Sequence, residues 1–201
     1  MFITLEGGEG AGKSTQARRL AERIAGEGRK VICTREPGGA PGAEVLRSLL
    51  LGGEVAWSTA AEVYLHFAAR AEHLARTILP ALAAGTVVVC DRFADSTMAY
   101  QGFGLGADKA LIAGLTRLLP VLPALTIWLV VPPAMGAERV AARPGRLDRY
   151  EALDAAFHGR VAEGYAALAA GEPGRIVAIG GDADVETVAA RVWDLVRGRL
   201  A

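Results

Sequence analysis

The chain begins, after Met1, with Phe2-Ile3-Thr4-Leu5-Glu6-Gly7-Gly8-Glu9-Gly10-Ala11-Gly12-Lys13-Ser14. Its first residues form a short apolar run that is typical of a buried strand, and the rest fits G-x-x-x-x-G-K-[ST]. Glycines let backbone N–H groups converge on phosphate oxygens, and the start of the following helix adds positive potential. The stretch therefore predicts a phosphate-binding loop (P-loop) that holds a nucleoside triphosphate.

Two side chains of this loop have predicted roles of their own. Lys13 can reach the β- and γ-phosphates, and the Ser14 hydroxyl can bind Mg²⁺. The alternative is a glycine-rich turn with an incidental lysine, but the strand before it and the helix after it favour a phosphate loop. The residues predicted to contact the triphosphate are Gly7, Gly8, Glu9, Gly10, Ala11, Gly12, Lys13, Ser14 and Thr15.

Outward from this loop, short apolar runs alternate with longer segments of helical periodicity. The predicted strands are Phe2–Leu5, Val31–Thr34, Thr86–Cys90, Thr126–Val131 and Arg175–Ile179. The predicted helices are Lys13–Ala25, Ala43–Leu51, Ser58–Ala84, Lys109–Leu119, Pro133–Ala142, Arg149–Ala169 and Val185–Arg199. Strands that are apolar almost throughout predict an α/β fold in which helices cover both faces of a parallel sheet. Ligands of such a sheet bind at the carboxyl ends of its strands.

Composition narrows the possible classes of protein. The chain has 201 residues, 52% of them hydrophobic, and a formal net charge of zero. This size fits a single domain over residues 1–201, and the charge argues against nucleic-acid or acidic-membrane partners. The longest apolar stretch, Val121–Val131, is too short to span a bilayer, and no signal-like segment begins the chain. We expect a cytoplasmic protein in which Cys33 and Cys90 are reduced core residues.

Two further features refine the class of nucleotide enzyme. The sequence contains no asparagine, which excludes the guanine-reading pattern N-K-x-D. The run Val87–Cys90 ends in Asp91-Arg92, where a carboxylate can hold Mg²⁺ through water and an arginine can hold a phosphate. The alternative for this pair is an exposed ion pair at the end of a strand. An ATPase or a small-molecule kinase remains.

Several segments resemble those of bacterial thymidylate kinases in their order and spacing. They are Thr34-Arg35-Glu36-Pro37-Gly38-Gly39, Phe67-Ala68-Ala69-Arg70, Asp91-Arg92-Phe93, Ser96-Thr97-Met98-Ala99-Tyr100-Gln101-Gly102 and the basic region Arg139–Arg149 with Asp148-Arg149-Tyr150-Glu151. The resemblance runs from Phe2 to about Tyr150. It implies a P-loop NTPase fold with a five-stranded parallel sheet and a short lid at about residues 143–149.

The same resemblance implies an activity and an assembly. A thymidylate kinase transfers the γ-phosphoryl group of ATP to dTMP, with Mg²⁺, and gives ADP and dTDP. Closure of a lid would exclude the water that competes with dTMP for the phosphoryl group. The resemblance also implies a homodimer, for which Ser58–Ala84 is a candidate interface.

On the acceptor side, the resemblance implies a set of residues around the base and sugar. Phe67 would stack on thymine, and Arg70, one turn later on the same helix, would donate to a thymine carbonyl. Thr97 would contact the base edge, and Tyr100, beside Gln101, would crowd the 2′ position of the sugar. By residue type alone, Phe67 is a core residue rather than a base platform, Tyr100 also fits a packing role, and Arg70 fits a solvated helix charge.

A second implied set holds phosphate and metal. Arg35 and Arg92 would bind the dTMP phosphate, and Glu9 would face the 3′-hydroxyl. Ser14, Asp91 and Asp148 would support one Mg²⁺ ion, with the carboxylates acting through water. His66, His73 and His158 show no metal-ligand spacing and are interpreted as structural or surface residues.

The source of the catalytic positive charge is the most specific prediction. Some thymidylate kinases place an arginine within the P-loop, where this chain has Gly10. The basic region would then supply the charge, with Arg143 and Arg146 joining Lys13 and Arg92 as catalytic residues. Arg139 and Arg149 are predicted to be structural or to lie on the adenine side, near the turn at residues 180–183. The alternative is a solvated loop whose arginines pair with neighbouring glutamates.

Two other functions stay open at this stage. One is a kinase for another nucleotide or for a non-nucleotide acceptor. The other is a P-loop regulatory module that hydrolyses ATP slowly or not at all.

Overall fold

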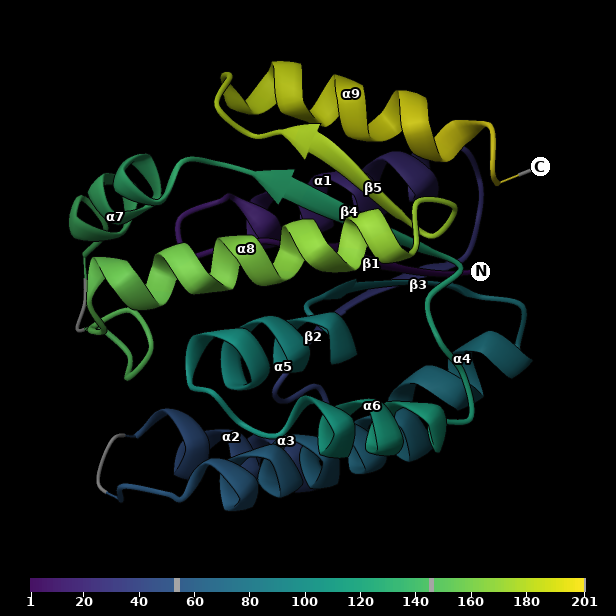
Figure 1. The fold of residues 1–201 in the computed structure, drawn as a ribbon. Coiled ribbons are helices and arrows are strands. Elements are labelled where there is room, and N and C mark those ends of the chain that lie inside the picture. Colours follow the sequence, from purple (N-terminus) through teal and green to yellow (C-terminus); the bar gives the residue numbers. More distant parts are fainter. Residues whose placement is uncertain (53–54, 145–146, 201) are drawn as a thin grey trace.

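In the computed structural model, five strands form one parallel sheet in the order β2-β3-β1-β4-β5 (Figure 1). Residues 1–52, 55–144 and 147–200 are described. The strand bounds are β1 Phe2–Glu6, β2 Val31–Arg35, β3 Val87–Asp91, β4 Leu125–Val130 and β5 Ile176–Gly180. The predicted α/β class and five-stranded parallel sheet are confirmed.

The sheet order explains how deeply each strand is buried. Central β1 pairs with β3 on one side and β4 on the other, and all five of its residues are buried. Edge strand β2 pairs only with β3 and is partly exposed. Cys90 of β3 is a buried core residue, as predicted, but Cys33 of β2 is exposed. The prediction for Cys33 was wrong because an apolar run at a sheet edge lacks a neighbour on one side.

Helices cover both faces of the sheet and extend below it in Figure 1. Their bounds are α1 Lys13–Gly26, α2 Pro41–Leu51, α3 Thr59–His73, α4 Leu79–Ala83, α5 Ala94–Thr97, α6 Lys109–Arg117, α7 Pro133–Ala141, α8 Ala155–Gly171 and α9 Val185–Arg197. Two π-helical segments, Leu74–Ile78 and Met98–Gly104, join α3 to α4 and follow α5.

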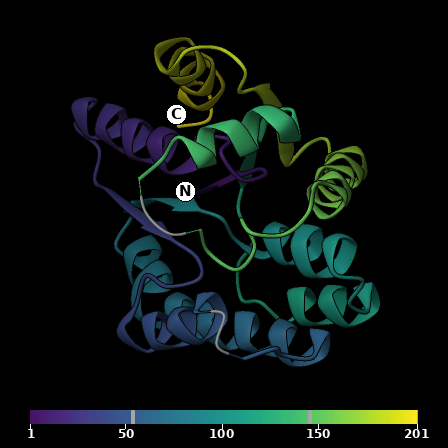
Figure 2. The ribbon, with the colours of Figure 1, turned by 90° about the vertical axis from the view of Figure 1, so that its left-hand side faces the viewer.

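Each face of the sheet has its own core. On one face, Leu20 and Ile24 of α1 and Val192 of α9 pack with Ile3 and Leu5 of β1. On the other, the π-helical turn Leu74–Ile78 packs against Phe2, Val88 and Cys90. A third cluster joins α8 to the segment Met98–Gly104. Figure 2 shows the fold after a 90° turn, with α8 viewed close to its axis. These cores fix the carboxyl ends of β1 and β3 beside one another.

The predicted helix Ser58–Ala84 is largely correct. Ser58 caps α3 by accepting a hydrogen bond from the backbone N–H of Ala61. The helical run continues to Ala83, but it widens into a π-helical turn just before Pro80. Proline removes one backbone donor, and a local π turn is one way to accommodate such a residue.

The predicted helix Arg149–Ala169 was wrong at its start, because α8 begins only at Ala155. The Asp148 side chain accepts hydrogen bonds from the backbone N–H groups of Tyr150 and Glu151 and holds residues 148–151 in a turn. Asp154 then caps α8 by accepting from the N–H of Phe157. Aspartate side chains compete with helical hydrogen bonds in this way, which favours turns and caps.

Candidate active site

A cavity of about 530 Å³ opens at the carboxyl ends of β1, β2 and β3. Its walls come from the P-loop, the loop after β2, helix α3, the segment from Asp91 to Gln101, and the end of α7 with the turn before α8. Its position agrees with the general rule for ligand sites on parallel sheets. Most of the predicted donor and acceptor residues therefore line one cavity, although Phe67 does not.

The P-loop has a backbone that only glycine adopts readily. Gly10 and Gly12 have φ values of +69° and +87°. A Cβ atom on Gly10 would collide with the backbone carbonyl of Gly136 in α7. Lys13 is buried and donates from Nζ to the carbonyl oxygen of Gly8 at 2.6 Å. Its pKa is lowered, first by burial and then by the nearby Arg92 charge.

Ser14 and Asp91 form the candidate metal position. The Ser14 hydroxyl donates to Asp91 Oδ2, while Asp91 Oδ1 is buried and has no hydrogen-bond partner among the described residues. An unpaired buried carboxylate oxygen beside a hydroxyl suits Mg²⁺, which prefers oxygen ligands and retains water. Within residues 1–52, 55–144 and 147–200, no group of three or more His, Cys, Asp or Glu side chains offers a protein-only metal cage.

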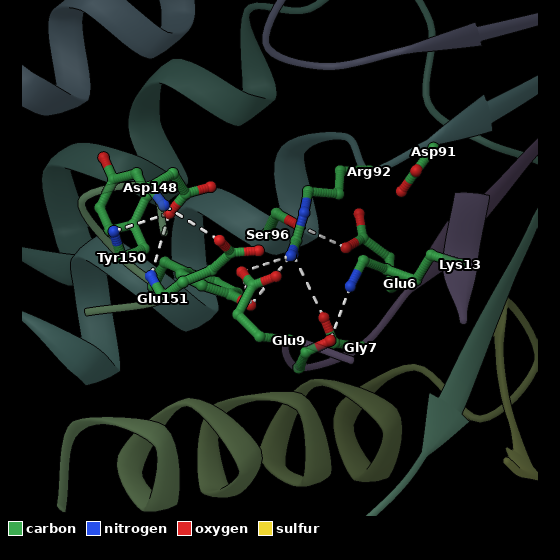
Figure 3. Close-up of polar contacts among 12 residues, drawn as sticks. Glu6, Gly7, Glu9, Lys13, Asp91, Arg92, Ser96, Asp148, Tyr150 and Glu151 are labelled. Atoms are coloured by element: carbon green, nitrogen blue, oxygen red, sulfur yellow. Dashed lines mark hydrogen bonds and ion pairs between the residues drawn. The ribbon is translucent and has the colours of Figure 1, made fainter. Parts of the chain in front are cut away.

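Arg92 is the charged centre of the site (Figure 3). It adopts a left-handed backbone conformation, with φ of +72°, which is rare for a residue with a side chain. Its guanidinium donates to Glu9 Oε1 at 2.7 Å and to the Tyr100 hydroxyl at 3.0 Å. Burial would raise the pKa of Glu9, but the charges of Arg92 and Lys13 outweigh it and lower that pKa to about 2.

Glu6 holds the backbone next to this arginine, a role that the sequence did not predict. Its Oε1 accepts from the backbone N–H of Phe93 at 2.7 Å, and its Oε2 accepts from the hydroxyls of Ser96 at 2.5 Å and Tyr165 at 2.8 Å. Burial, followed by the charge of Asp95, raises the pKa of Glu6 to about 7. These bonds hold the backbone directly after Arg92, which stabilises its strained conformation.

Arg70 occupies the other end of the cavity and is only 2% exposed. Its Nε donates to Glu36 Oε2 at 2.8 Å, and one terminal nitrogen donates to Thr97 Oγ1 at 3.1 Å. The other terminal nitrogen is buried without a partner in the described part of the chain. Glu36 also contacts His73 Nδ1 at 3.0 Å. Arg70 is therefore a positioned buried donor, and the alternative of a solvated helix charge was wrong.

Comparisons with known proteins agree with this arrangement. The family model described as thymidylate kinase matches residues 5–192. The chain belongs to the thymidylate kinase family. A thymidylate kinase of Gluconobacter oxydans is 50% identical over 204 residues, covering all of this chain and 95% of the relative. One from a Synechococcus strain is 52% identical and covers all of this chain and 96% of the relative.

A solved structure supports the same conclusion. The crystal structure of thymidylate kinase from Ehrlichia chaffeensis has a TM-score of 0.79 and is 34% identical, covering 98% of each chain. The predicted family and the predicted class of enzyme, an ATP-dependent nucleoside monophosphate kinase with a P-loop fold, are confirmed. No helix in the described residues is long and apolar enough to cross a membrane.

The thymidylate kinase resemblance placed Phe67 on the base, and the structure shows its actual surroundings. Phe67 is buried with Val63, Ala107 and Ile112, and the Arg70 guanidinium lies 4.7 Å from its ring centre. It is absent from the cavity wall, whereas its neighbour His66 lies in that wall with Arg70. His66 was missed, although it precedes Arg70 by four residues and so shares a helix face with it. Stacking of Phe67 on thymine stays a prediction.

Two arginines, Arg35 and Arg47, line the cavity near the loop after β2. Arg35 donates to both carboxylate oxygens of Glu44, at 3.0 and 3.1 Å, and is half exposed. Arg47, which sequence reasoning missed, donates to the carbonyl oxygen of Pro37 at 2.6 Å. Only the folded chain brings Arg47 of α2 to the cavity wall.

The basic region is only partly described. Arg143 lies in the cavity wall and pairs with Glu151, which is the partner that the alternative interpretation expected. Arg139 donates to the carbonyl oxygen of Gly181 at 3.0 Å, so it reaches the predicted adenine-side turn. Arg146 lies outside the described residues, as does Gly145. Asp148, the third predicted metal ligand, lies on the opposite side of Arg92 from Asp91 in Figure 3.

Proposed function

We propose how this member of the thymidylate kinase family moves the γ-phosphoryl group of ATP to dTMP. ATP phosphates bind the P-loop, and dTMP occupies the cavity between α3 and the segment Met98–Gly104. The observation that carries this proposal is that one cavity joins Lys13 and Arg92 at one end to the unpaired donor of Arg70 at the other.

At the donor end, the reaction is a direct transfer. A phosphate oxygen of dTMP forms a bond to the γ-phosphorus, the bond from that phosphorus to the bridging oxygen breaks, and ADP leaves. Lys13 follows the migrating charge, and the N–H groups at the start of α1 bind phosphate oxygens. Arg92 binds the acceptor phosphate, held in place by Glu9 and by the support from Glu6.

Mg²⁺ fits the same end of the site. Ser14 would hold the ion directly, and Asp91 would hold its water ligands through the buried oxygen that has no other partner. When bound, the ion neutralises charge on the phosphates. Asp148 remains a proposed outer contributor.

At the acceptor end, dTMP meets side chains rather than backbone. Arg70 donates to a thymine carbonyl, Thr97 and Gln101 contact the base edge, and Tyr100 limits space at the 2′ position. Arg35 binds the acceptor phosphate together with Arg92, and Phe67 stacks on the base or supports Arg70 from behind.

The region around residues 143–149 acts as a lid within a single domain. Arg143 exchanges Glu151 for the transferred phosphoryl group, and Arg146 contributes a second guanidinium. The Glu151 side chain is buried, whereas that of Arg143 is largely exposed. Arg143 can therefore move away from Glu151 while its guanidinium stays in contact with water.

We also propose a homodimer that works in the cytoplasm. Helices α2 and α3 pack together and carry exposed apolar side chains, Val45, Leu49 and Tyr64, and α3 lies within the predicted interface Ser58–Ala84. Analytical ultracentrifugation should show a dimer that the double substitution Leu49→Asp/Tyr64→Asp converts to monomer. A monomeric unmodified protein at micromolar concentration would contradict this part.

The activity is tested by measuring ADP release with a panel of monophosphates. We expect dTMP to give the highest kcat/KM, and the turnover to need Mg²⁺. A higher value for AMP, CMP or dGMP would favour a kinase of other specificity. Slow ATP hydrolysis that no monophosphate stimulates would favour a regulatory module.

A further inference from the structure

Glu62 of α3 lies wholly buried, one layer behind the base end of the cavity. Its Oε1 accepts hydrogen bonds from Gln101 Nε2 at 3.0 Å and from the Tyr150 hydroxyl at 2.7 Å. Its Oε2 is 2.8 Å from a terminal nitrogen of Arg149, an ion pair that is not aligned as a hydrogen bond. No step described so far uses this carboxylate.

The ion-paired carboxylate fixes where the surrounding protons lie. A carboxylate only accepts, so Gln101 must turn its NH₂ group toward Glu62, and Tyr150 must donate its single hydroxyl proton. The Tyr150 oxygen then accepts from Gln101 Nε2 and from His66 Nε2, each at 3.1 Å. Burial, followed by the charges of Arg70 and Arg92, lowers the pKa of His66 to about 3, so its ring is neutral. Because Tyr150 gives its only hydroxyl proton to Glu62, the ring proton of His66 lies on Nε2.

These hydrogen-bond directions decide which polar groups of Gln101 and Arg70 are left without a partner at the cavity. Gln101 lines the cavity, and its Oε1 has no hydrogen-bond partner among the described residues. Arg70 lines the same end. One of its terminal nitrogens donates a hydrogen bond to Thr97, four residues before Gln101, and the other is buried without a partner in the described part of the chain. Within the described ranges, the walls of this end thus hold one unpaired acceptor, on Gln101, and one unpaired donor, on Arg70.

This pattern distinguishes the pyrimidines. Thymine and uracil present an N3–H donor next to a carbonyl acceptor, which matches the acceptor of Gln101 and the donor of Arg70. Cytosine presents an unprotonated N3, which is an acceptor, next to an amino group, which is a donor. Its acceptor would face the acceptor of Gln101, and its donor would face the donor of Arg70. A buried site that is left with unpaired polar groups rejects a ligand far more strongly than an apolar site does.

We propose that Glu62 is a positioning residue for base selection: by fixing the direction of the Gln101 amide, it makes the cavity accept a base with an N3–H and reject cytosine. The inference rests on the proposed function, since it deepens the choice of acceptor at the same site. Glu62 touches no substrate and acts only through Gln101 and Tyr150.

The test compares kcat/KM for dTMP and dCMP in Glu62→Gln. A glutamine at this position can donate to Gln101 Oε1, so the Gln101 amide is free to turn. We expect the ratio of the dTMP value to the dCMP value to fall by about 10-fold or more, mainly through KM. Glu62→Asp keeps an acceptor-only group and should retain most of the preference. Glu72→Gln, at a partly exposed carboxylate of the same helix that pairs with Arg76, is the matched control and should leave the ratio unchanged.

Two outcomes separate the inference from the proposed function. If the unmodified enzyme phosphorylates dTMP but folded Glu62→Gln keeps its selectivity, Glu62 is merely structural and the inference fails. If the unmodified enzyme does not phosphorylate dTMP, the proposed function fails.

A second measurement needs no substitution and serves if Glu62→Gln does not fold. The chain contains only two glutamines, Gln16 and Gln101, so ¹⁵N-glutamine labelling gives two side-chain amides to assign. We expect the Gln101 NH₂ protons to exchange slowly with water, both with and without dTMP. Exchange at the rate of an exposed amide would overturn the inference.

Discussion

The two ends of the cavity are lined in different ways. At one end, the P-loop presents backbone N–H groups and Lys13 from a single stretch, Gly7 to Ser14. At the other end, side chains line the cavity, and two of them are held by buried carboxylates: Glu36 behind Arg70 and Glu62 behind Gln101. A backbone site tolerates changes in its neighbours, whereas a side-chain site depends on partners far away in the sequence. The two ends should therefore respond differently to substitution.

The largest effect is expected at the donor end. Lys13→Ala should lower kcat by roughly 10²-fold or more, because a cation is lost where charge develops in the transition state. Lys30→Ala, an exposed lysine outside the cavity, is the control. Steady-state kinetics with saturating ATP and dTMP measure the effect. Near-normal turnover in folded Lys13→Ala would contradict the role of the P-loop.

Substitution of the lid arginines should lower kcat by a similar factor. It should do so without weakening the binding of dTMP. Arg143→Ala should lower kcat by roughly 10²-fold, as the loss of an arginine finger does. The dissociation constant of dTMP, measured by calorimetry, should barely change, because the acceptor is held elsewhere. The double variant Arg143→Ala/Arg146→Ala should be at least as slow. If the double variant turned over at the full rate, the catalytic charge would have another source.

A smaller effect is expected from the 5-methyl group of the acceptor base. The enzyme should prefer dTMP to dUMP by about 1–3 kcal/mol, since both bases satisfy the same hydrogen bonds and differ by one methyl. Competition between the two substrates in one assay gives the ratio directly. A ratio near one would mean that the base end is selected by polar contacts alone, which would sharpen the contrast between the two ends.

The smallest effect concerns stability and pH. The pKa of Glu6 is raised from about 4.5 to about 7, so the folded state binds this proton more tightly than the unfolded chain does. Its contribution to the free energy of unfolding therefore falls as pH rises through that interval and stays low above it. Between pH 4.5 and 7.5, the free energy of unfolding of the unmodified protein should fall by on the order of 1–3 kcal/mol relative to that of Glu6→Gln. Urea unfolding at several pH values measures this, and parallel curves would count against it.

The sequence predicted the parts of the fold and site that depend on neighbouring residues. The P-loop, the five strands and the Asp91-Arg92 pair are each contiguous, and their local patterns have physical meaning without a partner. Cys33 failed because sheet order decides which strand lies at the edge. The start of α8 failed because one aspartate at position 148 diverts backbone donors from the helix.

The missed residues share one property, which is dependence on distant contacts. Glu6 meets Tyr165 across 159 positions, and Glu62 meets Tyr150 across 88. An isolated glutamate at the end of a strand or within a helix has no local signal of these roles. The position of His66 in the cavity wall could have been predicted, because its four-residue spacing from Arg70 places both residues on one face of the helix.

The contact between Gly10 and Gly136 limits how this enzyme can evolve. An arginine within the P-loop would need a Cβ atom at Gly10, where the α7 backbone already lies and where φ is positive. A single mutation to arginine would therefore push α7 away before the new guanidinium could act. A lineage with this packing cannot place an arginine at this position of the P-loop while α7 stays where it is. An arginine at position 10 would require α7 to shift first. A single substitution at Gly10 is therefore not enough to move the arginine into the P-loop.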